Sequence, residues 1–216
     1  MNLLTPFRLT LTIITSLLFI LIIISGSLNF IVRYDFIYDY NIATYSIDER
    51  TSLNLDKIKE INFNIKTYFF DKNELLDVDI YSDKEILHMK DVKHIMNLIF
   101  NLGKILSIVF CVLIFLLHSY FEVHLNKVIF YSVILFSSIL ILLGVSFLLF
   151  FQEIFIIFHK IAFNNDLWIL NPNTDYLLMM FPEDFFRDVA VLILLSSFLL
   201  NVIVYFLFRK LSFRSK

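Results

Sequence analysis

The chain contains very little glycine, proline or cysteine: three Gly, three Pro and one Cys in 216 residues. Turns draw heavily on Gly and Pro, so their scarcity argues against a loop-rich β fold. The single cysteine, Cys111, excludes a disulfide bond within the chain. Cys111 also lies inside an apolar run, where a thiol is a poor nucleophile, and we interpret it as a packing residue.

Familiar catalytic and metal-binding patterns are also missing. The sequence has no Gly-x-Ser-x-Gly elbow for a nucleophilic serine. No His-x-x-x-His motif or cysteine pair offers two metal ligands on one helical face, so no metal is expected. The basic residues are scattered or flank apolar runs, which disfavours nucleic acid as a partner. Acid–base work by histidine is the chemistry that remains.

Apolar residues are abundant: 59% of the chain is hydrophobic and 26 residues are Phe. A soluble domain has about 45–50% apolar residues. Four apolar runs reach the roughly 20 residues that a membrane-spanning helix needs, and lipid admits such runs as helices. The sequence therefore predicts an α-helical integral membrane protein with four transmembrane helices and a small extracellular cap between the first two.

The expected segments follow from these runs. The transmembrane helices are predicted at 1–32, 95–117, 128–151 and 189–208. The other segments are a cap at 33–94, a cytoplasmic loop at 118–127, an extracellular loop with the catalytic segment at 152–188 and a cytoplasmic tail at 209–216. The first run is longer than the signal-peptide core of about 7–15 residues, and no small-x-small cleavage site follows it. We therefore expect a retained helix.

Charge predicts the orientation of these helices. Residues 33–93 hold 9 Lys and Arg against 13 Asp and Glu, and residues 152–188 hold 2 against 6, so each segment has a net charge of −4. The N-terminus offers Arg8, the 118–127 loop offers Lys127, and the tail holds Arg209, Lys210, Arg214 and Lys216. Because cytoplasmic loops carry an excess of Lys and Arg, both termini are predicted to be cytoplasmic and both acidic segments extracellular.

Local patterns predict some structure within the cap. Apolar residues recur at helical spacing and indicate a helix near 54–66. Leu76, Val78 and Ile80 alternate with polar residues, which indicates a short strand or an extended piece. Ser82 followed by Glu85 is a capping box, so a helix should begin near residue 83 and continue into the second transmembrane run.

Two histidines stand out because the predicted topology brings both to one face of the membrane. His88 has Asp91 at i+3, on the same helical face, where a carboxylate can orient an imidazole. His159 precedes a polar stretch that contains Asn165, Asp166 and Trp168. The simpler alternatives are a solvated histidine in a capped helix and an interfacial loop anchored by tryptophan.

The other three histidines carry less signal. His94 lies six residues after His88 and should face elsewhere on the helix. His118 and His124 lie in the inner loop, six residues apart and not on one helical face. We interpret these two as interfacial residues.

These features together resemble the lipoprotein intramolecular transacylase (Lit) family of Gram-positive bacteria. The resemblance covers essentially the whole chain. It rests on four membrane helices, an outer cap of about 60 residues and two blocks of sequence. The first block is residues 88–92, His-Met-Lys-Asp-Val. The second is Phe158-His159 through Asp166-x-Trp168, Asp175 and Pro182-x-x-Phe185-Phe186.

The resemblance implies a substrate, a reaction and a site. The partner would be a diacylglyceryl-modified bacterial lipoprotein in the plasma membrane, together with membrane lipids. The acyl chain would move from the glyceryl sn-2 ester to the α-amino group of the N-terminal cysteine, giving a lyso-form lipoprotein without any cofactor. The family's two catalytic histidines match His88 and His159. The supporting or substrate-binding residues would be Asp91, Asn165, Asp166, Trp168 and Asp175.

Two other function classes remain open. A non-enzymatic membrane sensor or assembly protein would bind a peptide with its outer cap and would not need either histidine. A transporter or channel would need polar residues deep in several spans and often shows inverted repeats, neither of which is evident here.

Overall fold

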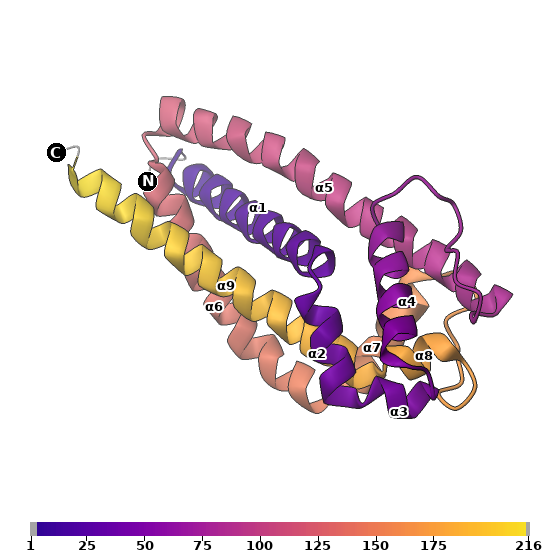
Figure 1. The fold of residues 1–216 in the computed structure, drawn as a ribbon. Coiled ribbons are helices and arrows are strands. Elements are labelled where there is room, and N and C mark those ends of the chain that lie inside the picture. The colour runs from indigo at the N-terminus through magenta and orange to yellow at the C-terminus, as the bar shows by residue number, and fades with distance from the viewer. Residues whose placement is uncertain (1–3, 215–216) are drawn as a thin grey trace. The chain divides into compact units, whose positions relative to one another are not determined.

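The computed structural model describes residues 4–214, which form nine α-helices and no strand (Figure 1). The helices are α1 (Leu4–Arg33), α2 (Phe36–Tyr45), α3 (Ile47–Thr51), α4 (Leu55–Tyr68), α5 (Asp83–Phe121), α6 (Leu125–Leu149), α7 (Phe151–Ala162), α8 (Tyr176–Met180) and α9 (Glu183–Arg214). The outermost ends of the first and last expected segments, residues 1–3 and 215–216, lie outside the described residues.

Four of these helices, α1, α5, α6 and α9, are long and apolar enough to cross a membrane. They contain the predicted runs, except that the third run, 128–151, extends two residues beyond the end of α6 at Leu149. Two of them start ahead of their runs: α5 begins at Asp83 and α9 at Glu183. Residues 83–94 include six Asp, Glu or Lys residues. The charged first three turns of α5 thus precede the apolar run that was predicted to begin near residue 95.

The chain divides into two compact units. The first comprises Met1–Leu28, Phe100–Leu149 and Leu192–Lys216, and the second comprises Asn29–Ile99 and Phe150–Val191. In the first unit, buried hydroxyls join the helices. Ser16 donates to the carbonyl of Val128 at 2.8 Å, linking α1 to α6, and Ser132 donates to Asn201 at 2.9 Å, linking α6 to α9. Such bonds and small side chains drive helix association in lipid, where the hydrophobic effect is absent.

Helices α1 and α5 approach closely at Gly103. A Cβ atom built on Gly103 would lie 2.3 Å from the hydroxyl oxygen of Ser25. No larger residue fits at this position without movement of the neighbouring helix, because real Cβ atoms do not approach other atoms so closely. Glycine is therefore required here by packing and not by backbone conformation.

One end of the first unit carries the start of α1, the α5–α6 connection and the end of α9 (Figure 1). Arg8 of α1 donates to the carbonyl of Phe121, and the Phe130 and Tyr205 rings of α6 and α9 lie 5.8 Å apart. The start of α1 and the end of α9 thus lie at the same end of this unit.

The α5–α6 turn brings His118 and His124 together. α5 ends at Phe121, Glu122 adopts a positive φ of 55°, and the two imidazole centroids are 5.6 Å apart. Helical spacing alone did not anticipate this proximity, because the chain reverses direction between the two residues.

In the second unit, α4 matches the helix predicted near 54–66. Its N-cap Asn54 accepts a hydrogen bond from the Lys57 N–H at 2.8 Å. Ile58, Ile61 and Ile65 are buried on one face, as their spacing predicted.

Residues 76–80 were predicted as a short strand or an extended piece, and among residues 4–214 no strand is present there. Residues 69–82 connect α4 to α5 as turns and bends, although Leu76 and Val78 are buried. The N–H of Tyr81 donates to the carbonyl of Val78 at 3.2 Å, which closes a turn. The alternating sequence pattern reflects the burial of every second side chain. It does not reflect a β-ladder, because no strand is present among residues 4–214.

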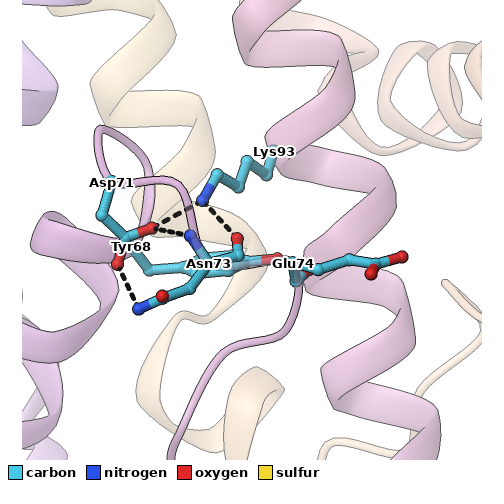
Figure 2. Close-up of polar contacts among 5 residues, drawn as sticks. All are labelled: Tyr68, Asp71, Asn73, Glu74 and Lys93. Atoms are coloured by element: carbon cyan, nitrogen blue, oxygen red, sulfur yellow. Dashed lines mark hydrogen bonds and ion pairs between the residues drawn. The ribbon is translucent and has the colours of Figure 1, made fainter.

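A buried lysine fastens this connection to α5 (Figure 2). The Lys93 ammonium donates to the Asp71 carboxylate at 2.7 Å and to the Asn73 carbonyl at 2.8 Å, and it lies 4.0 Å from the centre of the Tyr68 ring. Tyr68 in turn donates to the Glu74 carbonyl at 2.9 Å. These contacts hold the 69–82 connection against the helix that carries His88.

Candidate active site

The first turns of α5 position His88. The predicted capping box is confirmed, since the Ser82 N–H and hydroxyl both donate to the Glu85 carboxylate at 2.7 Å. Beyond the cap, one stripe of the helix is buried, including Glu85, His88, Met89 and Lys93. His88 is therefore a buried residue of the second unit and not a solvated one.

Helix α7 positions His159. Phe151, Phe155 and His159 recur at i, i+4 and i+8 and stack along one face, with ring centroids 5.5 Å and 4.4 Å apart. Phe186 from the first turn of α9 packs on Phe155 at 5.4 Å. The 152–188 segment, which was expected as an extracellular loop, is thus largely helical. The aromatic face of α7 carries the His159 imidazole.

The two imidazoles meet within the second unit. The ring centroids of His88 and His159 are 6.1 Å apart, although 71 residues separate them. Phe163 contacts both rings, at 5.2 Å and 5.5 Å. Both histidines are less than a tenth exposed. Two imidazoles this close together can act on the same reacting group.

The protonated nitrogen of His159 follows from its hydrogen bond. Its Nδ1 lies 2.7 Å from the backbone carbonyl of Phe155. A carbonyl oxygen only accepts hydrogen bonds, so Nδ1 must carry the proton. In the neutral ring the free lone pair is then on Nε2, which is the atom able to accept a proton.

His88 has a buried ring nitrogen that is not used by the fold. Its Nδ1 is buried and makes no hydrogen bond within residues 4–214. Burial and the neighbouring His159 lower the pKa of His88 to about 4, with Lys84 adding to this effect and Asp91 opposing it. A buried polar atom without a partner is uncommon, and such atoms often belong to functional sites.

Both imidazoles are therefore neutral near pH 7. Burial lowers the pKa of His159, and the hydrogen bond to Phe155 opposes that change only partly. Two neutral imidazoles each provide one N–H donor and one lone pair. The pair can thus accept a proton at one position and donate a hydrogen bond at another, among the rings of Phe155, Phe163 and Trp168.

Three of the five supporting residues lie close to the pair or to each other. Asn165 donates to the Asp91 carboxylate at 2.8 Å, and the ring of Trp168 lies 5.1 Å from that of His159. Asp91 therefore joins α5 to the 163–175 loop, the segment between α7 and α8. Sequence reasoning assigned Asp91 to the support of His88 or to substrate binding and did not anticipate its bond to Asn165.

The other two supporting residues are not brought to the imidazoles by any contact in the described chain. The Asp166 side chain is exposed and makes no hydrogen bond or ion pair within residues 4–214. Asp175 accepts hydrogen bonds from the Asn171 N–H at 2.7 Å and the Thr174 hydroxyl at 3.3 Å, which closes its own turn. Because both hydrogen bonds of Asp175 lie within its own turn, they favour a structural role for this residue.

Sequence reasoning did not identify Phe155, or the hydrogen bond that the Glu85 carboxylate accepts from the backbone N–H of Leu177. The i, i+4, i+8 spacing of Phe151, Phe155 and His159 was a signal for Phe155. Among the described residues, no group of three or more His, Cys, Asp or Glu side chains could hold a metal ion.

Comparison with known proteins identifies the family. A family model described as lipoprotein intramolecular transacylase Lit matches residues 13–186. The solved structure of the membrane-integral lipoprotein intramolecular transacylase Lit from Bacillus cereus is similar, with a TM-score of 0.82 and 25% identity over 97% of each chain. A variant of that protein with a histidine replaced by alanine gives a TM-score of 0.80 and 24% identity, over 97% of this chain and 95% of that one.

An uncharacterized protein of Aquifex aeolicus is 29% identical over 126 residues. This match spans 58% of the present chain and 55% of that relative, or about half the length of each. The family match, by contrast, extends from the first transmembrane helix to the start of the last. The chain belongs to the lipoprotein intramolecular transacylase Lit family, whose members are membrane-integral enzymes.

Proposed function

We propose that this protein moves an acyl chain within a diacylglyceryl-modified lipoprotein, from the glyceryl sn-2 ester to the α-amino group of the N-terminal cysteine. The observation that carries the proposal is the buried pair His88 and His159, whose rings lie 6.1 Å apart in an aromatic setting. The product is a lyso-form lipoprotein with an N-acyl chain.

The reaction requires the amine and the ester to be correctly oriented and a proton to be transferred between them. It consumes no protons overall. The amine nitrogen attacks the ester carbonyl carbon, a C–N bond forms, and the C–O bond to the glyceryl C2 oxygen breaks. The proton lost by the amine balances the proton gained by the glyceryl oxygen. Amide formation from an ester is downhill, so no coenzyme is required. Orientation can contribute effective molarities of about 10⁵–10⁸ M when both groups are held together.

The hydrogen bonds suggest which histidine accepts the proton. The Nδ1–H of His159 donates to the Phe155 carbonyl, so Nε2 carries the lone pair and is the base. His88 is neutral near pH 7 because its pKa is low, and its N–H is the donor to the oxyanion and to the departing glyceryl oxygen. The proton that His159 takes from the amine returns to that oxygen.

The aromatic residues around the pair serve to exclude water. Phe155, Phe163 and Trp168 contact the imidazoles and shield them from competing hydrolysis of the ester. No serine elbow is present in the sequence and Cys111 is not in the second unit, so direct transfer without an acyl-enzyme intermediate is proposed.

The topology is part of the proposal. Both termini are placed in the cytoplasm of a bacterial plasma membrane, with the site at the extracellular face in contact with membrane lipids. The support comes from the acidic charge of the 33–94 and 152–188 segments, together with the shared end of α1 and α9.

The test is mass spectrometry of a lipoprotein N-terminus from cells that do or do not produce this protein. The expected product has the same mass as the diacylglyceryl form but carries one acyl chain on nitrogen. Mixed acyl-labelled and unlabelled lipoproteins should each retain their own acyl group. Label crossing between peptides, or an acyl group trapped on the enzyme, would exclude direct intramolecular transfer.

A further inference from the structure

The 163–175 loop is attached to α5 at two points. Asn165 donates to the Asp91 carboxylate at 2.8 Å, and the Lys84 ammonium donates to the backbone carbonyl of Ile169. Between these attachments lies Trp168, whose ring packs on His159. The loop that forms one wall of the His159 site is therefore tied to the helix that carries His88.

The two attachments lie on either side of His88. Residues 84, 88 and 91 follow the i, i+4, i+7 spacing that places side chains on one helical face. At a rise of 1.5 Å per residue, Lys84 lies about 6 Å before His88 along α5, and Asp91 lies about 4.5 Å after it. The Lys84 contact before His88 and the Asp91 contact after it hold the 163–175 loop across the face of α5 that carries the His88 imidazole.

From this arrangement we infer that Lys84 is a positioning residue for the proposed reaction: it holds residues 165–169 over the histidine pair and keeps Trp168 against His159. The inference rests on the proposed function for its catalytic consequence, but the loop contact itself does not depend on that function. Neither the apolar runs nor the sequence blocks of the family resemblance point to Lys84.

The ammonium of Lys84 also acts on the electrostatics of the pair. The ionisable groups that bear on His88 are Lys84 and Asp91 on its own helix and His159 on α7; Phe163, which packs on its ring, carries no charge. Lys84 and His159 disfavour protonation of His88, whereas Asp91 favours it. Lys84 therefore helps to keep His88 neutral as well as holding the loop.

Lys90 provides a matched control on the same helix. It lies two residues after His88, about 200° around the helix and so on a different face. Its ammonium pairs with Glu74 on the 69–82 connection and does not contact the 163–175 loop. Exposed pairs of this kind contribute roughly 0–1 kcal/mol to stability, so Lys90→Met should fold normally.

The experiment uses Trp168, which is the only tryptophan in the chain. Full-length Lys84→Met, Lys84→Arg and Lys90→Met proteins would be purified in detergent, and quenching of tryptophan fluorescence by acrylamide would be measured. Lys84→Met should make Trp168 more accessible and shift its emission to longer wavelength. Lys84→Arg can still donate to Ile169 and should resemble the wild type, as should Lys90→Met.

Activity gives the second readout. Loss of one charge-assisted hydrogen bond should lower the transacylation kcat of Lys84→Met about tenfold with little change in KM. Since the cation no longer disfavours protonation of His88, the acidic limb of the pH profile should move to higher pH. Lys84→Arg should restore both the rate and the profile, which a general loss of stability would not produce.

The possible outcomes separate the two hypotheses. Unchanged Trp168 quenching in Lys84→Met would overturn the inference, as would equal exposure of Trp168 in Lys90→Met. If the wild-type protein produced no N-acyl lipoprotein, the proposed function would fail, and the fluorescence comparison would still decide whether Lys84 holds the loop.

Discussion

The Glu85 carboxylate accepts a 2.7 Å hydrogen bond from the backbone N–H of Leu177, 92 residues further along the chain. Its other oxygen accepts from the N–H and hydroxyl of Ser82. Glu85 thus caps its own helix and also holds α8, one turn before His88. It is almost fully buried and forms no salt bridge within residues 4–214.

Replacement of Glu85 by alanine should destabilise the protein strongly, because the Leu177 and Ser82 donors lose their acceptors. The expected decrease in the free energy of unfolding is about 3 kcal/mol, since hydrogen bonds to charged groups contribute roughly 1.5–3 kcal/mol. Glu85→Gln keeps one acceptor oxygen and should lose less. Thermal unfolding of both variants in detergent provides the measurement; equal losses would show that one remaining acceptor oxygen does not stabilise this site.

His159→Asn separates the structural from the catalytic nitrogen of the imidazole. The Asn amide lies near the position of Nδ1 and can still donate to the Phe155 carbonyl, but nothing replaces Nε2. The variant should therefore fold with nearly wild-type stability and lose about 10²–10⁴-fold in transacylation rate. His88→Ala should likewise be inactive, whereas Asp91→Asn should lose less because the imidazole remains.

Full activity of His159→Asn would remove the base assignment. Cys111→Ser serves as the control and should remain active, because the only thiol lies outside the second unit.

Stability should fall as pH decreases from about 6.5 toward 4. The pKa of His88 is lowered to about 4 in the folded protein, so the unfolded chain binds more protons in this interval. The contribution of His88 to stability is present above pH 6.5 and falls by roughly 2 kcal/mol at pH 5. His88→Gln should show a shallower dependence in thermal unfolding at pH 7 and pH 5.

The matched control for this dependence is His94→Gln, at an exposed position on the same helix. It should retain the wild-type slope. A slope that survives in His88→Gln would place the titrating group elsewhere.

Lys93→Met should destabilise the 69–82 connection. The substitution removes two hydrogen bonds and leaves the half-buried Asp71 carboxylate without its cation. The loss should be about 2 kcal/mol, less than the 3–5 kcal/mol for a fully buried pair because Asp71 is partly solvated. Lys90→Met, which removes the exposed pair with Glu74, should cost less than about 1 kcal/mol. Similar losses in thermal unfolding would contradict the special role of Lys93.

The proposed orientation predicts where an introduced cysteine reacts. In a Cys111→Ser background, cysteine at Lys72 or Asn173 should be labelled on intact cells by a thiol reagent that does not cross membranes. Both positions are exposed and lie in acidic segments assigned to the outside. Labelling only after cell lysis would show that these segments face the cytoplasm and would contradict the proposed orientation.

The parts of the fold that depend on local patterns could be predicted from the sequence. The apolar runs marked α1, α5, α6 and α9, and the Ser82–Glu85 pair marked the start of α5. Both signals depend on residues that are neighbours along the chain, so their physical cause is visible without knowledge of the tertiary structure.

Contacts between distant residues were less accessible. The alternation around Val78 gave the same signal as a strand, because burial at every second residue does not require a partner strand. The bond between Glu85 and Leu177 depends on where α8 lies, which no local pattern specifies. For the histidine pair, the order of the membrane crossings predicted one face, but the 6.1 Å separation required the helical segment α7, which had been expected as a loop.

The links Ser16–Val128 and Ser132–Asn201 set an order for assembly during synthesis. α6 can join α1 as soon as both have entered the bilayer, but Ser132 must wait for Asn201 near the end of the last helix. Every residue of the second unit has by then left the ribosome. A premature stop codon just before Asn201 would therefore yield a chain that contains both histidines but lacks the hydrogen bond that joins α6 to α9.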